Sequence, residues 1–204
     1  MLRKLMHTAY NYKEGPFAFR YPRGSVQEQT TSLQAENTVQ IGKGAILREG
    51  NDVALLAVGP MVKNALDAAE ILSEKGVSVA VYDMIFVKPV DTDIIDGLSK
   101  KCMPIITVED GTTVGGLGSA VADRLVETGS KSKMTKIGIP DNFVTHGTIA
   151  QLQTLCGMDA QSIADKALEL IESVNPLEQK TESRADGKTP LKAIDNFEHS
   201  NTAI

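Results

Sequence analysis

A motif with two arginines is the first candidate for chemistry in this chain. The stretch AFRYPRGSV, residues 18–26, places Arg20 and Arg23 around a Tyr-Pro pair. Pro22 fixes its own φ and biases the residue before it toward extended geometry, and Gly24 permits a sharp turn close to a ligand. The corner therefore holds Arg23 with little backbone freedom. A guanidinium fork suits a phosphate, but it also suits a salt bridge to a carboxylate, and the residues alone hardly favour phosphate.

Two carboxylates and a histidine are the next candidates. Glu109 and Asp110 end a predicted strand, and open α/β sheets bind ligands at the carboxyl ends of their strands. A carboxylate pair there could perform acid–base chemistry or could cap the following loop, and the residues favour neither. His146 could titrate near neutrality, although capping of the next helix is its favoured role. The sequence shows no Ser-His-Asp order, Cys-His signature or metal cluster, so these residues do not make a complete active site.

A glycine-rich stretch, GGLGSA at 115–120, opens a predicted helix after the same strand. The amides of a helix N-terminus can hold a phosphate. The stretch is neither G-x-G-x-x-G nor a P-loop, because no Gly-Lys-Ser/Thr follows. Close packing of the helix on the sheet is therefore the favoured interpretation.

The composition excludes several classes of protein. The 204 residues fit one domain with or without tails, and 42% hydrophobic residues supply a sizeable core. A net charge of −5 lacks the basic bias of a nucleic-acid binder. Apolar runs such as VALLAV at 53–58 are too short to span a bilayer, and no signal peptide is visible. Cys102 and Cys156 match no metal spacing and indicate reduced thiols in a cytosolic protein.

Strands and helices alternate from residue 52 onward. The strands are continuous apolar runs, which indicates burial on both faces, as in a parallel sheet. This alternation predicts a doubly wound α/β sheet with helices on both faces. Pro60 suits a first helical turn, and Asp91 is a candidate helix cap. The predicted strands are 52–59, 77–84, 103–110 and 134–140, and the predicted helices are 60–76, 91–101, 115–129, 148–157 and 159–174.

The flanking segments are predicted from their local patterns. Apolar spacing predicts a helix within residues 1–14, and a brief apolar alternation predicts a strand that ends at the arginine corner. Residues 39–52 read as two short strands. The predicted organisation is an N-terminal helix and entry strand (1–24), a polar connecting loop (25–37), an α/β domain (38–174) and a polar, mobile tail (175–204).

Five stretches, in this order, resemble the C-terminal domain of the 1-deoxy-D-xylulose-5-phosphate synthase family, within the transketolase superfamily. Their order and spacing are specific, and the resemblance runs from about Leu2 to Val174. It implies a three-layer α/β/α fold with a mostly parallel five-stranded sheet. The stretches are PFAFRYPRG, IGKGAILREGNDVALLAVG, VYDMIFVKPVD, TVEDGTTVGGLGSAV and IGIPDNFVTHGT.

The resemblance implies part of a thiamine diphosphate-dependent transferase. Family enzymes use this cofactor and Mg²⁺ to condense pyruvate with D-glyceraldehyde 3-phosphate, with loss of CO2, and they supply isoprenoid and thiamine synthesis. The cofactor lies between an N-terminal and a middle domain that this chain lacks, so the chain alone is expected to bind no cofactor or metal and to be inactive.

The expected partners are those two domains, in the same chain or a separate one, within a homodimer. The expected location is the cytoplasm, or a plastid in a photosynthetic eukaryote. No nucleic-acid or membrane partner is expected.

The resemblance also assigns roles to single residues. Arg23 matches the arginine that reaches the substrate phosphate, and Arg20 supports its loop. Glu109 and His146 are possible accessory residues, and no catalytic or metal-binding residue is expected in this chain. Ile85 departs from the family, which often has Arg at this position, and Asp110-Gly111 stands where the family often has Glu-Asn.

Two other classes stay open. The chain could be a stand-alone regulatory or interaction module that kept this fold. It could also be the C-terminal part of a 2-oxo acid dehydrogenase beta subunit, in which a phosphate-binding arginine has no obvious substrate. Within the synthase interpretation, both an excised fragment and one half of a split enzyme fit the sequence.

Overall fold

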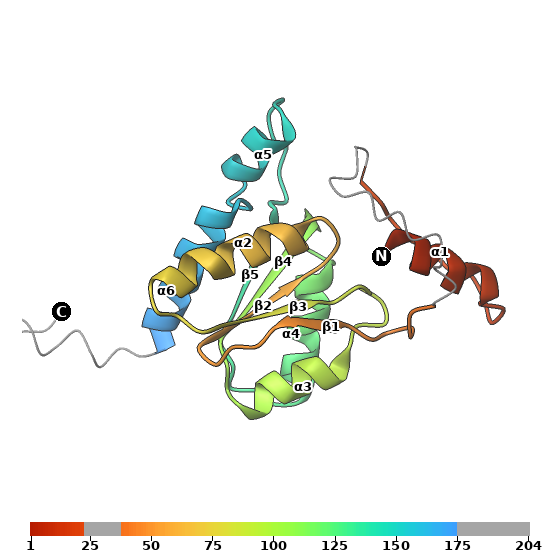
Figure 1. The fold of residues 1–204 in the computed structure, drawn as a ribbon, viewed down its shortest axis with the longest axis horizontal. Coiled ribbons are helices and arrows are strands. Elements are labelled where there is room, and N and C mark those ends of the chain that lie inside the picture. The colour runs from red at the N-terminus through yellow and green to blue at the C-terminus, as the bar shows by residue number, and fades with distance from the viewer. Residues whose placement is uncertain (23–37, 175–204) are drawn as a thin grey trace, which may run out of the picture. The chain divides into compact units, whose positions relative to one another are not determined.

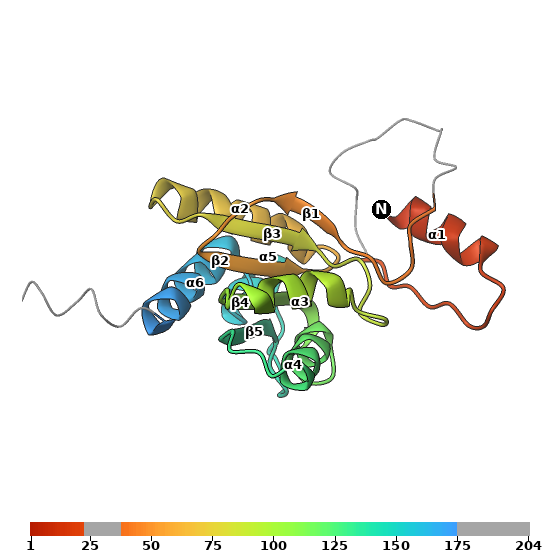
Figure 2. The same ribbon diagram turned by 90° about the horizontal axis from the view of Figure 1, so that it is seen from below.

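A five-stranded sheet organises the described part of the chain, which is residues 1–22 and 38–174 of a computed structural model. The strand order is β1-β3-β2-β4-β5, which Figure 2 shows from top to bottom. Only β1 is antiparallel to its neighbour, so the prediction of a mostly parallel five-stranded sheet is confirmed. The strands are β1 (Ala45–Arg48), β2 (Val53–Ala57), β3 (Val79–Asp83), β4 (Ile105–Thr112) and β5 (Met134–Ile139).

Helices cover both faces of this sheet (Figure 1). One face packs against α2 and α6, and the opposite face packs against α3 and α4. This arrangement is the expected three-layer α/β/α fold, because parallel strands need crossover connections that return over the faces. The helices formed by the described residues are α1 (Leu2–Asn11), α2 (Met61–Glu74), α3 (Thr92–Lys100), α4 (Leu117–Glu127), α5 (Ile149–Leu155) and α6 (Ala160–Val174).

The burial of the central strand β2 explains its continuous apolar sequence. All five of its residues are buried. Val53, Leu55 and Ala57 belong to the apolar cluster with α2 and α6, whereas Ala54 and Leu56 belong to the cluster with α3 and α4. Successive side chains of a strand point to opposite faces, so a strand covered on both sides must be apolar throughout.

Two predictions for the N-terminal part are wrong. Residues 15–22 form no strand, although their apolar residues alternate. The alternation instead serves an aromatic cluster, in which the Phe17 ring contacts the rings of Tyr12, Phe19 and Phe86. Residues 39–52 hold one strand rather than two, because a turn occupies the first predicted strand. Arg23, Gly24, the predicted loop (25–37) and the predicted tail (175–204) lie outside the described residues.

Asp91 caps α3, as predicted, and also ties this helix to the segment before β1. Its buried carboxylate accepts hydrogen bonds from the N–H groups of Asp93 at 3.0 Å and Ile94 at 3.5 Å, and from the Gly44 N–H at 2.9 Å. Burial by itself would raise the pKa of Asp91. These three N–H donors and the Lys43 ammonium outweigh burial and hold the pKa below its usual value.

Asp91→Ala should therefore lower the free energy of unfolding by about 2–3 kcal/mol, because it removes a helix cap and leaves the Gly44 N–H without its acceptor. Thermal unfolding followed by circular dichroism should show a melting temperature that is roughly 5–10 °C lower at neutral pH. Asp91→Asn is the matched control, because it keeps a capping oxygen but loses the charge. Its melting temperature should lie between those of the wild type and Asp91→Ala.

The loss of stability caused by Asp91→Ala should depend on pH. The pKa of Asp91 is lower in the folded state than in the unfolded chain. Its stabilising contribution is thus fully present above the unfolded value, about 4, and is lost as the pH falls through the folded value. The stability difference between the wild type and Asp91→Ala should shrink below about pH 4. A difference that stayed constant into stronger acid would contradict this assignment.

Candidate functional site

The carboxyl ends of β2 and β4 lie side by side in the middle of the sheet. From β2 the chain continues into α2 on one face, and from β4 it continues into α4 on the other face. The direction of the strand order reverses between these two strands. Open α/β sheets bind ligands outside the carboxyl ends of the strands at such a switch point. We call this edge of the sheet the carboxyl edge.

The segment with the arginine motif contacts the carboxyl edge at two places. The Phe17 ring lies 6.3 Å, between centroids, from the ring of Phe86, which follows β3. Arg20 Nη1 lies 3.8 Å from the position that a Cβ atom would take on Gly111 of β4. Arg20 is exposed and forms no ion pair within residues 1–22 and 38–174. The structure thus brings Arg20 to the end of the strand that carries Glu109.

Glu109 uses its carboxylate to cap α4. The side chain is buried, and its Oε2 accepts a hydrogen bond from the Leu117 N–H while its Oε1 accepts one from the Gly118 N–H, each at 2.8 Å. These donors belong to the helix N-terminus, where a negative charge also interacts favourably with the helix dipole. The sequence left acid–base chemistry and capping open for Glu109, and the contacts in the structure are those of a cap.

Two glycines allow the start of α4 to lie close to the sheet, and the first of them makes room for this carboxylate. A Cβ atom on Gly116 would stand 1.9 Å from Glu109 Oε2, and one on Gly118 would stand 2.8 Å from the buried Thr107 Oγ1. Neither position tolerates a side chain without a shift of its surroundings. The glycine-rich stretch therefore serves close packing, as predicted, and two of its amides bond Glu109 rather than a phosphate.

His146 is exposed and does not cap α5, so its predicted capping role is wrong. The cap is Thr148, whose Oγ1 accepts a hydrogen bond from the Gln151 N–H, while Gln151 Oε1 accepts one from the Thr148 N–H. The missed signal was the Thr-x-x-Gln spacing of a capping box. In the described part of the chain, no hydrogen bond or ion pair joins His146 to Arg20 or Glu109.

Asp83, at the end of β3, is a polar group of the carboxyl edge that sequence reasoning missed. Burial raises the pKa of its carboxyl group, opposed by a 3.0 Å hydrogen bond from the Ile85 N–H to Oδ1. Ile85 itself has a φ of 56°, a conformation that a β-branched residue rarely adopts. The residue types of Asp83 and Ile85 do not predict this left-handed backbone, because such a conformation is usually adopted by Gly or Asn.

The described residues do not fit a thiamine diphosphate and Mg²⁺ site. Residues 1–22 and 38–174 contain no group of three or more His, Cys, Asp or Glu side chains that could hold a metal ion. The Glu-Asp-Gly stretch at 109–111 contributes its first carboxylate to the α4 cap. Cys102 and Cys156 are free thiols. Over the same residues, each helix is too short or too polar to cross a membrane.

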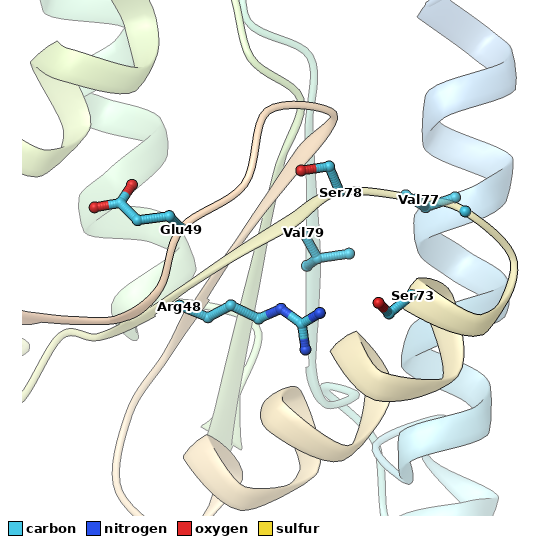
Figure 3. A pocket seen from close by; sticks show the side chains of 7 residues that line it. Arg48, Glu49, Ser73, Val77, Ser78 and Val79 are labelled. Atoms are coloured by element: carbon cyan, nitrogen blue, oxygen red, sulfur yellow. The ribbon is translucent and has the colours of Figure 1, made fainter.

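Two pockets lie elsewhere in the described structure. One, of about 280 Å³, is formed where β1 ends beside the start of β3 (Figure 3). Its cation, Arg48, is already paired with Glu70, with 2.7 Å between Nη1 and Oε1. The other, of about 250 Å³, lies between α4 and β5 and is lined mainly by small and aliphatic residues. Neither pocket includes Arg20, Glu109 or His146.

Comparison with known proteins identifies the family to which this chain is similar. Residues 42–163 match the model of the transketolase C-terminal domain. A 1-deoxy-D-xylulose-5-phosphate synthase from Parabacteroides distasonis is 44% identical over 163 residues, which cover 80% of this chain and 26% of that protein. The corresponding synthase from Bacteroides thetaiotaomicron is 39% identical over 184 residues, which cover 88% of this chain and 28% of that protein. The chain thus spans about a quarter of the length of these curated relatives.

A solved structure agrees with the sequence relatives. The split gene transketolase, described as an inactive beta4 tetramer, superimposes with a TM-score of 0.62 at 31% identity, over 66% of this chain and 44% of that chain. The residues matched by the family model include all five strands of the sheet and the Glu109 cap. The chain therefore belongs to the family of transketolase C-terminal domains.

Proposed function

We propose that this chain is the C-terminal domain of a 1-deoxy-D-xylulose-5-phosphate synthase. The observation that carries the proposal is the 44% identity with such a synthase over 80% of the chain. In the proposed reaction, pyruvate and D-glyceraldehyde 3-phosphate give 1-deoxy-D-xylulose 5-phosphate and CO2. Thiamine diphosphate and Mg²⁺, held by the preceding domains, supply the carbon–carbon bond chemistry. This chain contributes the substrate-phosphate contact and contacts between domains.

The arginine motif has the proposed phosphate-binding role. Arg23 presents its guanidinium to the phosphate of the aldehyde, because a planar fork can give two charge-assisted hydrogen bonds to phosphate oxygens. Arg23 follows Arg20 by three residues in the sequence, and Arg20 lies beside the end of β4, which supports this role. Arg20 braces the corner and adds positive charge. The α4 amides of Leu117 and Gly118 are bonded to Glu109, so they leave the phosphate to the arginines.

Glu109 is proposed as a positioning residue rather than as an acid or base. Both of its oxygens bond the start of α4, and Gly111, beside Arg20, is two residues further along the same strand. By fixing the end of β4 against α4, the carboxylate fixes the surface on which Arg20 rests.

A second arrangement of the same function is a separate subunit of a split enzyme. The likeness to a split gene transketolase favours this arrangement. In both arrangements, the part that corresponds to the first three quarters of the relatives must be supplied from elsewhere in the polypeptide or by another chain.

A chimeric enzyme tests the proposed function. The P. distasonis synthase, cut before its matched region, would be fused to the full present chain at Met1. With thiamine diphosphate and Mg²⁺, the chimera should form 1-deoxy-D-xylulose 5-phosphate from the two substrates, whereas either part alone should not. The intact P. distasonis enzyme is the positive control. A folded chimera without turnover would overturn the proposal.

Arg23→Ala, in the active chimera, should lower kcat/KM for D-glyceraldehyde 3-phosphate at least tenfold. A charge-assisted contact to a phosphate is worth about 1.5–3 kcal/mol, which corresponds to about tenfold or more in rate. Arg23→Lys should recover only part of the loss, because an ammonium lacks the fork. Non-phosphorylated glyceraldehyde is the control substrate, with which Arg23→Ala should lose little. Equal losses with both aldehydes would mean that Arg23 is structural.

Glu109→Gln should destabilise the chain and leave the pH profile of the chimera unchanged. The substitution removes the charge and turns one of the two acceptors into a donor that faces an N–H, at a cost of about 2–3 kcal/mol, or roughly 5–10 °C in melting temperature. Asp110→Asn, at the neighbouring exposed carboxylate, is the matched control and should be nearly neutral. If Glu109→Gln instead removed one limb of the kcat/KM profile without loss of stability, Glu109 would be an acid or base.

A further inference from the structure

Helix α5 carries apolar side chains on one side, and two of them are largely exposed. None of its seven residues is buried. Ile149, Leu152 and Leu155 follow each other at intervals of three, which places them within one side of the helix. Ile149 is 69% exposed and Leu155 is 63% exposed. So short a helix is marginal on its own and depends on packing of its apolar side for stability.

Two neighbouring loops carry further exposed apolar side chains. Val114, after β4, is 58% exposed, and Phe143, after β5, is fully exposed. The two loops leave the sheet together, because the Thr113 N–H donates a hydrogen bond of 3.0 Å to the Ile139 carbonyl. Figure 1 shows α5 beyond the ends of β4 and β5, rather than over a face of the sheet. We call the group of Val114, Phe143, Ile149 and Leu155 the apolar rim.

We infer that the apolar rim is the surface on which the preceding part of the synthase docks, and that this docking covers the carboxyl edge. The inference rests on the proposed function and goes further by naming the surface. Single exposed apolar residues are ordinary, but several that follow the ends of two adjacent strands indicate an interaction surface. The chain spans only about a quarter of its relatives' length, so in the proposed synthase a part about three times its size would be available to cover the rim.

The size of the rim favours this occupant over a second copy of the chain. Stable interfaces between separate proteins bury about 1,200–2,000 Å² in total, and four side chains provide a small part of that area. A domain in the same polypeptide, or in a subunit with further contacts, meets the rim at a high effective concentration, so a small apolar patch suffices. Docking there would also exclude water from the arginine motif, which would strengthen its contact with a phosphate.

The test uses the chimera described above with the double substitution Phe143→Ser/Ile149→Ser. We expect turnover to fall at least tenfold, while the isolated chain with the same substitutions keeps its melting temperature, because neither side chain is buried there. The control is Ile46→Ser/Val126→Ser, which removes two exposed apolar side chains from β1 and α4, outside the rim. It should leave turnover unchanged.

Hydrogen exchange supplies a readout that does not depend on turnover. The amides of residues 141–155 should exchange more slowly in the wild-type chimera than in the isolated chain, and the rim substitutions should abolish this protection. If the rim variant of the chimera had the same turnover and the same amide protection as the wild-type chimera, this would contradict the rim inference but not the proposed function. A folded wild-type chimera without turnover would contradict both the proposed function and the rim inference. If the isolated chain dimerised and only the rim substitutions made it monomeric, the occupant would be a second copy, contrary to the inference.

Discussion

The bond between the Glu109 carboxylate and the start of α4 is the contact on which the carboxyl edge depends. A buried carboxylate is costly unless its oxygens are bonded, and here each oxygen accepts a backbone N–H. The same contact satisfies two amides that a helix N-terminus always leaves without partners. Since Glu109 stands in β4, the contact fixes where the central layer ends and where the helical layer begins. Gly116 is a condition for this contact, because a side chain at that position would occupy the space of the carboxylate.

This arrangement decides how the edge can bind an anion. In many α/β proteins the helix amides at the switch point hold the phosphate. In this chain two of those amides donate hydrogen bonds to Glu109, whose carboxylate lies beside the start of the helix. An anion at the same edge needs cations from another segment, and the segment that supplies one is the arginine motif, through Arg20 beside Gly111. In the proposed site, the arginine motif would therefore supply the positive charge for the phosphate, since Glu109 occupies these two amides.

The sequence predicted those parts of the fold whose local signals agree with their tertiary surroundings. The continuous apolar run at β2 and the capping residue Asp91 are examples, since burial and hydrogen bonding act within a few residues. The alternation in residues 15–22 misled because aromatic contacts with Phe86, far along the chain, replace a strand ladder. Glu109 could not be assigned from sequence, since its donors lie eight and nine residues away, outside any capping motif. The left-handed backbone of Ile85 has no residue-type signal at all.

The described residues close the core of the domain by themselves, whereas the proposed site uses exposed groups at the carboxyl edge. Two apolar clusters, one on each face of the sheet, close around β2 with residues of the described chain alone. The side chains of the apolar rim and of Arg20 are exposed, so they add little to this core. Exposed groups at this edge are free to meet another domain or subunit without cost to the core. The core is thus built mainly by the middle of the strands and the proposed site by groups at their carboxyl ends, and Glu109, which caps α4 at such an end, links the two.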